Sequence, residues 1–142
     1  MGEEAPEWTL EVDGATISST ELEGSVVVLA FFASWCGPCR AEMPELNSLA
    51  GVLLSEQAPV VVLGVSTDVS QEDFGEYIEE LRPEHLGTGR NPEMAAAFGV
   101  RAIPHTFIIS PSGTVLAMHN GFSGDTRAIE KDIRDGIENA GR

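Results

Sequence analysis

A seven-residue apolar run, Val26 to Phe32, leads into a segment that holds both cysteines of this chain, Trp35-Cys36-Gly37-Pro38-Cys39. The run is rich in β-branched and aromatic residues, which is typical of a strand buried on both faces. Apolar residues after the segment recur at steps of three and four, which predicts a helix with one buried face. These residues are Cys39, Met43, Leu46, Ala50 and Leu53. The fold must therefore place a cysteine pair between a buried strand and a helix.

The remaining pattern predicts an α/β fold with a mixed sheet. A second apolar run, Val60 to Ser66, completes a βαβ unit, whose crossover should be right-handed. Asp13-Gly14 separates two short β-rich stretches, which indicates an N-terminal hairpin. Further along we expect a helix capped by Ser70, a loop over Glu84–Pro92, a short helix over Glu93–Phe98, an antiparallel pair formed by Thr106–Ile109 and Thr114–Met118, and a closing helix marked by Ile129, Ile133 and Ile137.

Size and charge narrow the possible classes of protein. The chain has 142 residues and is 42% hydrophobic, so we expect one domain over residues 1–142, with a core that needs no structural metal. Its 23 acidic and 8 basic residues give a net charge of −15, which disfavours binding to nucleic acids and anionic lipids. The acidic surface is explained by solubility or by adaptation to high salt, and less readily by docking of a basic partner.

The beginning of the chain does not resemble a targeting segment. Met1 to Leu10 is acidic and contains Pro6, whereas a secretory signal has a basic start and an apolar centre. No apolar run approaches the length that crosses a membrane. We therefore expect no membrane span.

The cysteine spacing predicts reversible disulfide chemistry. Cys36 falls at the start of the predicted helix, where free N–H groups and the helix dipole favour an anion and lower a thiol pKa into a range of about 3.5 to 7.5. Cys36 is therefore the predicted nucleophile. Cys39 lies about one turn further along and is the predicted resolving thiol. Pro38 stiffens the first turn without removing a needed donor.

Two other interpretations of the cysteines are weaker. A structural zinc site needs four ligands, yet there is no second cysteine pair, and His85, His105 and His119 lack the usual spacing of zinc ligands. A purely structural disulfide would close so short a loop that it would constrain the unfolded chain little.

The segment Phe31 to Pro44 resembles the active-site segment of the thioredoxin superfamily, and more narrowly of its TlpA/ResA-like extracytoplasmic thiol-disulfide oxidoreductases. The resemblance extends to Ala5–Leu10, Val60–Asp68 and Val100–Ile109, and so covers nearly the whole chain. It implies a thioredoxin fold, with helices flanking a mixed sheet and an N-terminal hairpin extension.

One departure from thioredoxin proper affects the proton chemistry. Thioredoxin carries a buried aspartate where this chain has Ala30. Glu42 lies three residues after Cys39, and in having a glutamate at this position the chain is similar to TlpA/ResA-like proteins. A partly buried carboxylate there could accept the Cys39 proton as a general base, which requires a raised pKa. The alternative is a solvated glutamate near the helix start.

The resemblance also implies a substrate-binding loop. It implies that Pro104 is cis and faces the cysteines, and that the backbone of Ile103 pairs with the substrate polypeptide. A branched aliphatic residue at Ile103 suits a reductase more than an oxidant. His105 either stabilises the Cys36 thiolate or points into the sheet. The expected substrate surface comprises Trp35, Gly37, Pro38, Ile103, Pro104 and His105.

By this resemblance, the protein reduces or exchanges disulfides in protein substrates and takes electrons from a membrane-bound or soluble thiol donor. Such proteins serve cytochrome c maturation, copper-centre assembly or thiol homeostasis in the periplasm or at the cell exterior, with a leader or anchor absent from this chain. We expect a monomer that needs no metal and no cofactor beyond the Cys36–Cys39 disulfide.

Two other functions are open to this fold. Sco-like assembly factors hold copper with two cysteines and a histidine, here Cys36, Cys39 and His105. However, they use Cys-x-x-x-Cys, whereas Gly-Pro between the thiols favours disulfide closure. A peroxidase of the peroxiredoxin type would need Thr-x-x-Cys, which is absent.

Overall fold

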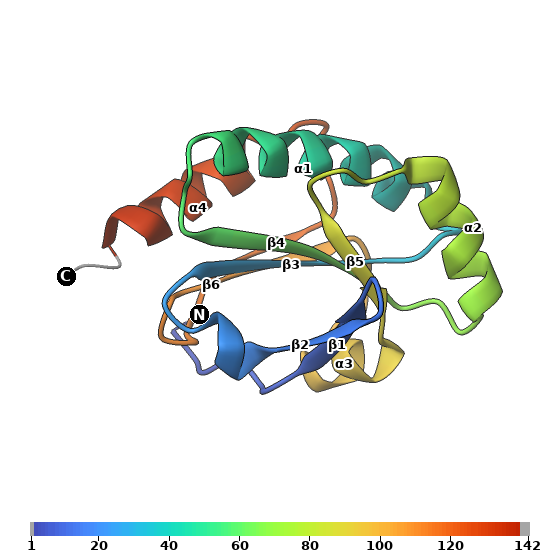
Figure 1. Cartoon of the computed structure of the whole chain (residues 1–142), viewed down its shortest axis with the longest axis horizontal. Helices are drawn as coiled ribbons and strands as arrows, with labels where there is room; N and C mark the ends of the chain where they lie inside the picture. The colour runs from blue at the N-terminus through green and yellow to red at the C-terminus, as the bar shows by residue number, and fades with distance from the viewer. Residues whose placement is uncertain (1, 140–142) are drawn as a thin grey trace.

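Strand β3 (Val26–Phe32) lies at the centre of a five-stranded mixed sheet in the computed structural model, which describes residues 2–139 (Figure 1). It pairs in parallel with β4 (Val60–Ser66) and antiparallel with β6 (His105–Ile109). Strand β5 (Gly87–Arg90) pairs with the far edge of β4, and β7 (Val115–Asn120) with the far edge of β6. The predicted mixed sheet is confirmed, including the parallel βαβ unit.

Helices cover one face of this sheet. Helix α1 (Gly37–Ser55) and α4 (Arg127–Asn139) lie across it, and α2 (Gln71–Leu81) lies at its side (Figure 1). The predicted apolar stripe of α1 is buried, from Cys39 to Leu53, and packs on alternate residues of β3. Because strand side chains alternate between faces, these β3 residues are Val26, Val28, Ala30 and Phe32.

A hairpin and a short helix cover the other face. Strands β1 (Thr9–Val12) and β2 (Ala15–Ser18), the 3₁₀ helix η1 (Ser19–Leu22) and α3 (Pro92–Ala97) lie on this side (Figure 1). Trp8 and Leu10 pack there against Val27, Leu29 and Phe31. The predicted hairpin is confirmed, and its turn residues Asp13 and Gly14 have φ of 50° and 81°, as a tight primed turn requires.

The region predicted as a loop over Glu84–Pro92 contains strand β5, and this prediction was wrong. Leu63 to Ser66 of β4 pair with Gly87 to Arg90. Glycine has a low strand propensity, so the sequence Gly-Thr-Gly-Arg indicates a loop. The glycines have a steric reason: a Cβ atom at Gly89 would collide with the backbone oxygen of Glu11 and with Leu10. The hairpin can approach this edge strand only because the side chain is missing.

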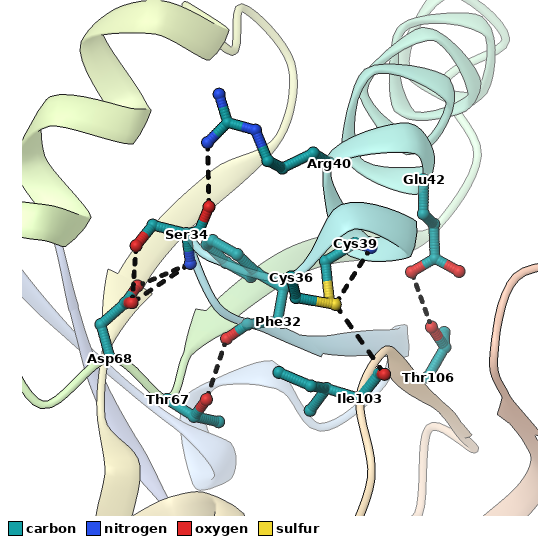
Figure 2. Close-up of a disulfide and its surroundings, with 10 residues drawn as sticks. All are labelled: Phe32, Ser34, Cys36, Cys39, Arg40, Glu42, Thr67, Asp68, Ile103 and Thr106. Carbon is teal, nitrogen blue, oxygen red and sulfur yellow. Dashed lines mark hydrogen bonds between the residues drawn. A yellow bond between two sulfur atoms is a disulfide. The ribbon is translucent and has the colours of Figure 1, made fainter.

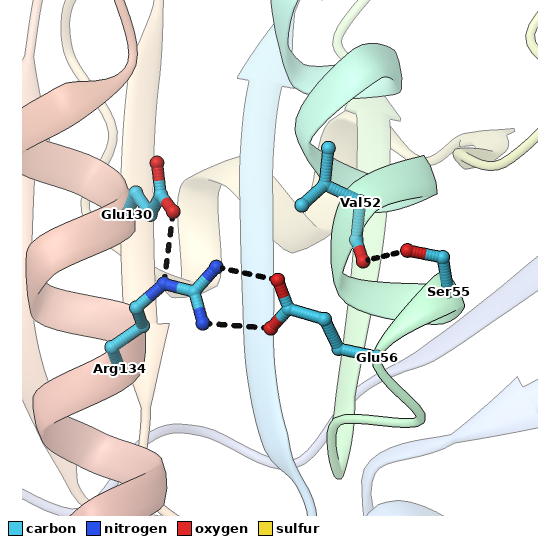
Figure 3. Close-up of polar contacts among 5 residues, drawn as sticks. All are labelled: Val52, Ser55, Glu56, Glu130 and Arg134. Atoms are coloured by element: carbon cyan, nitrogen blue, oxygen red, sulfur yellow. Dashed lines mark hydrogen bonds and ion pairs between the residues drawn. The ribbon is translucent and has the colours of Figure 1, made fainter.

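An exposed ion-pair cluster links helix α4 to the end of α1 (Figure 3). The guanidinium of Arg134 donates to both carboxylate oxygens of Glu56, at 2.8 and 3.2 Å, and to Glu130 one turn earlier in α4, at 2.8 Å. Exposed pairs contribute little stability, so burial of Ile129 and Ile133 is the main reason that α4 stays on the sheet.

Within residues 2–139, the longest apolar stretches of helix fall short of what is needed to cross a bilayer.

Gly89→Ala should destabilise the fold by about 1 to 3 kcal/mol, because the added methyl group overpacks the contact between β5 and the hairpin. Urea unfolding measures the effect. Gly75→Ala in α2 is a matched control, because a Cβ atom at Gly75 meets nothing within 4 Å. This control should be neutral or stabilising by up to about 1 kcal/mol. Equal stabilities of the two variants would contradict the steric explanation of β5.

Candidate active site

Cys36 stands where β3 gives way to α1, as predicted. It is the N-cap residue of α1, and its Sγ accepts a hydrogen bond from the Cys39 backbone N–H at 3.2 Å. Pro38 occupies the first turn of the helix. Cys36 and Cys39 form a disulfide, with their Cα atoms 5.2 Å apart (Figure 2). The sulfur of Cys36 thus lies at the positive end of a 19-residue helix, which favours a thiolate after reduction.

The two cysteines differ in their access to solvent. Cys36 is 5% exposed and Cys39 is fully buried, in the order predicted for a nucleophile and a resolving thiol. The residues around Cys36 are much more open: Trp35 is 74% exposed, and Gly37 and Pro38 are also exposed. A polypeptide could therefore approach Cys36 over these three residues, whereas Cys39 is reached only from within the protein.

Glu42 lies in α1, one turn beyond Cys39, and is fully buried. The hydroxyl of Thr106 donates to Oε1 at 3.3 Å, whereas Oε2 is buried without a partner among the described residues (Figure 2). Burial raises the pKa of Glu42 to about 7, against the smaller lowering effect of Thr106. The alternative of a solvated glutamate is wrong, and the carboxyl group is buried more deeply than the partly buried site predicted.

The peptide bond between Ile103 and Pro104 is cis, as the resemblance implies. The loop faces the disulfide: the carbonyl oxygen of Ile103 lies 3.9 Å from the Sγ of Cys36 (Figure 2). Pro104 is buried, and Ile103 is half-buried. This loop and the exposed residues Trp35, Gly37 and Pro38 therefore lie around Cys36.

His105 belongs to the opposite face of the sheet from Glu42. Its ring stacks on that of Phe107 with centroids 4.5 Å apart, and Phe107 belongs to the apolar cluster that faces the hairpin. Burial lowers the pKa of His105, which favours the neutral imidazole, and its Nδ1 atom is buried without a partner among the described residues. Of the two alternatives for His105, the geometry matches the one in which the side chain points into the sheet. It differs from that prediction in one respect, because Nδ1 has no hydrogen-bond partner among the described residues.

This placement also bears on copper binding. Thr106 faces α1, so His105 before it faces away, because strand side chains alternate. Within residues 2–139 no three His, Cys, Asp or Glu side chains form a group that could hold a metal ion. The donor set Cys36, Cys39 and His105 does not fit a copper site in this structure.

A polar anchor that the sequence pattern did not predict lies on the other side of the disulfide (Figure 2). Asp68 follows β4, is 2% exposed, and accepts hydrogen bonds from the backbone N–H of Ser34 at 3.1 Å and from its hydroxyl at 2.8 Å. The hydroxyl of Ser66 also donates to Asp68, at 2.6 Å. Polar residues that follow a parallel strand often line the functional edge of a sheet, and this position could have indicated Asp68.

Arg40 completes this anchor. Its guanidinium donates to the carbonyl oxygen of Ser34 at 2.9 Å, pairs with Glu80 at 2.6 Å, and lies over the ring of Tyr77 at 4.6 Å. The peptide groups on either side of the Ser34 Cα atom are thus bound by Asp68 and by Arg40. These contacts hold the turn that presents Trp35 and Cys36.

Comparison with known proteins agrees with this geometry. A model of the AhpC/TSA family matches residues 1–118. The thiol-disulfide oxidoreductase ResA of Oceanobacillus iheyensis is 31% identical over 121 residues, and the alignment covers 81% of this chain and 62% of the relative. The chain thus spans about three fifths of the length of this relative.

Two solved structures share the fold. One, from Chlorobium tepidum, is described as a thiol:disulfide interchange protein DsbE; it has a TM-score of 0.86, 29% identity and 96% coverage of each chain. The other is the exposed lipoprotein thioredoxin of Streptococcus pneumoniae, with a TM-score of 0.81, 27% identity and coverage of 92% of this chain and 99% of that chain. With a matching family model over most of its length and a thioredoxin fold around a Cys-Gly-Pro-Cys disulfide, this chain belongs to the AhpC/TSA family.

Proposed function

We propose that this protein is a thiol-disulfide oxidoreductase that reduces disulfides in protein substrates. The observation that carries the proposal is the order of groups along α1: a disulfide whose accessible sulfur caps the helix, whose second sulfur is buried, and behind which lies a buried carboxyl group with a pKa of about 7. In this proposal Cys36 is the nucleophile, Cys39 the resolving thiol and Glu42 the general base.

The reaction starts from the reduced protein and transfers two electrons. The Cys36 thiolate attacks one sulfur of the substrate disulfide, and the other substrate sulfur leaves as a thiolate. Cys39 then loses its proton to Glu42 and attacks the Cys36 sulfur. The second substrate sulfur leaves, so the substrate becomes a dithiol and the Cys36–Cys39 disulfide forms. The pKa of Glu42 near 7 suits proton transfer at neutral pH.

The substrate surface in this proposal surrounds Cys36. The exposed Trp35 offers an aromatic face, and the carbonyl oxygen of Ile103 lies beside the sulfur and can accept a hydrogen bond from an extended substrate chain. The exposed Gly37 and Pro38 and the backbone of the cis-proline loop at Pro104 complete this surface, whereas the side chain of His105, predicted as part of it, faces the other side of the sheet. The redox group is the disulfide itself, so the proposed reaction uses no organic cofactor or metal.

We further propose that electrons come from a thiol donor and that the protein works outside the cytoplasm. The 27% identity to an exposed lipoprotein of Streptococcus pneumoniae supports this location. The aliphatic Ile103 before the cis-proline supports a reductase. A Cys36–Cys39 reduction potential near about −270 mV agrees with this direction, and one near about −120 mV would indicate an oxidant.

Cys39→Ser should trap the mixed disulfide between Cys36 and a substrate, because the resolving thiol is absent. We expect the variant to form a covalent adduct with reduction-sensitive linkage when it is incubated with insulin, and mass spectrometry should locate the linkage at Cys36. Cys36→Ser is the control and should form no adduct, because Cys39 is buried. Adducts through Cys39 in that control would contradict the assigned roles.

Glu42→Gln should slow attack by Cys39 at neutral pH by at least about 100-fold, because the general base is lost. Stopped-flow insulin reduction with pre-reduced protein measures this step across pH. Glu45→Gln is the matched control, since Glu45 lies in the same helix but is exposed. Unchanged rates and pH profile in Glu42→Gln would remove Glu42 from the mechanism.

The same variant also has a predictable effect on stability. The folded protein holds the Glu42 proton more tightly than the unfolded chain between pH 4.5 and about 7, so stability falls as pH rises through this window. The shift corresponds to about 3 kcal/mol. The oxidised Glu42→Gln variant should not lose stability in this way. The unfolding free energy of the variant, relative to that of the wild type, should therefore increase from pH 4 to pH 8. Parallel stability curves would contradict the raised pKa.

Asp68→Asn should disturb the turn before Cys36, because an amide nitrogen would replace an oxygen that accepts from Ser34 or Ser66. We expect a loss of about 1 to 3 kcal/mol in stability. The rate of Cys36 alkylation should also change. Asp73→Asn is the control, because Asp73 is exposed on α2. An alkylation rate equal to that of the wild type would leave Asp68 with a purely structural role.

A further inference from the structure

Thr106 occupies a particular position with respect to the disulfide. It lies in β6, two residues after the cis-proline, is fully buried, and projects from the face of the sheet that α1 covers. Its partner in the central strand is Ala30, which presents only a methyl group on the same face. The hydroxyl of Thr106 is thus a hydrogen-bond donor in apolar surroundings.

Because of the hydrogen bond from this hydroxyl, the two oxygens of the Glu42 carboxylate differ in their surroundings. Thr106 donates to Oε1 at 3.3 Å, and Oε2 is left buried without a partner among the described residues. Buried carboxylate oxygens are normally satisfied, so an oxygen without a partner needs a reason. Cys39 precedes Glu42 by one turn on the same buried stripe of α1. Oε2 is therefore the oxygen of Glu42 whose capacity to accept a proton is not already used by a hydrogen bond.

We propose that Thr106 is a positioning residue that holds Glu42 by Oε1 and thereby keeps Oε2 available for the Cys39 proton. This inference rests on the proposed role of Glu42 as general base. A threonine suits the position because its hydroxyl orients the carboxylate, while its β-branched shape fills the same space as valine.

The hydrogen bond also opposes the effect of burial on the base. Burial raises the Glu42 pKa, and the Thr106 bond lowers it. The helix-covered face carries other ionisable groups: Cys39 in α1, Tyr77 in α2, and His119 of β7, which pairs with Asp132 of α4 at 2.6 Å. Strands β3 and β6 add none there, since His105 faces the other side. Loss of the hydroxyl should therefore move the Glu42 pKa further upward.

A two-step thiol reaction tests the inference. Reduced protein is mixed with the aromatic disulfide dithiobis(nitrobenzoate), and Cys36 releases one coloured thiolate as it forms a mixed disulfide. Attack by Cys39 then releases the second thiolate. The second phase is compared across pH in the wild type, Thr106→Val, Thr106→Ser, Glu42→Gln and the double variant Thr106→Val/Glu42→Gln.

Thr106→Val removes a hydrogen bond to a charged group. We therefore expect the midpoint of the pH dependence of the second-phase rate to move up by about one pH unit. At pH 7 this shift slows the second phase about five-fold. The first phase should not change. Thr106→Ser should restore the wild-type profile, since it keeps the donor. In the Glu42→Gln background, Thr106→Val should have no further effect on the second phase.

The outcomes separate this inference from the proposed function. If Glu42→Gln leaves the rate of the second phase unchanged, Glu42 is not the general base, and the roles proposed for Glu42 and for Thr106 are both overturned. If Glu42→Gln slows it but Thr106→Val keeps the wild-type midpoint, only the role of Thr106 is overturned. Equal slowing of both phases in Thr106→Val, or additive slowing in the double variant, would likewise show that Thr106 acts on the fold and not through Glu42.

Discussion

The structure depends on the enclosure of strand β3. Its two edges are paired, with β4 on one side and β6 on the other, and all seven of its side chains are buried. A strand satisfied in this way has one register and one direction, so the point at which it ends is also determined. Cys36 follows that point and caps α1, and the loop of the cis-proline enters β6 beside it (Figure 2). The redox pair is placed by the core.

Two buried carboxyl groups flank the disulfide, and their surroundings differ. Asp68 accepts hydrogen bonds from the Ser34 amide, the Ser34 hydroxyl and the Ser66 hydroxyl, and together with Arg40 it holds the turn before Cys36. Glu42 accepts one bond, from Thr106, and its other oxygen has no partner among the described residues. A satisfied carboxylate stabilises a structure, whereas a desolvated one holds its proton to near-neutral pH. The first is suited to holding a loop and the second to moving a proton.

The parts of the fold that the sequence predicted are those with strong periodic patterns. The period-3.6 stripe of α1, the apolar runs of β3 and β4 and the Asp13-Gly14 turn each reflect a local rule, and each is confirmed. Strand β5 has no such pattern. It forms because β4 offers a free edge and because Gly89 lets the hairpin approach, and both conditions arise from residues distant in sequence. Local propensity therefore predicted a loop where the tertiary structure makes a strand.

The sequence by itself determined the redox pair, its place between a strand and a helix, and the separation of Cys36 from the more buried Cys39, because these follow from spacing along one chain segment. Only the tertiary structure decided which polar groups face the pair. The side chains of Thr106 and His105 are adjacent in sequence yet lie on opposite faces of the sheet, so one reaches Glu42 and the other stacks on Phe107. Asp68 and Ser34 come after two neighbouring strands, β4 and β3, and are joined by hydrogen bonds only in the folded protein. Desolvation raises the pKa of Glu42 to about 7. It depends on every element packed around that carboxyl group, so no local pattern of residues predicts it.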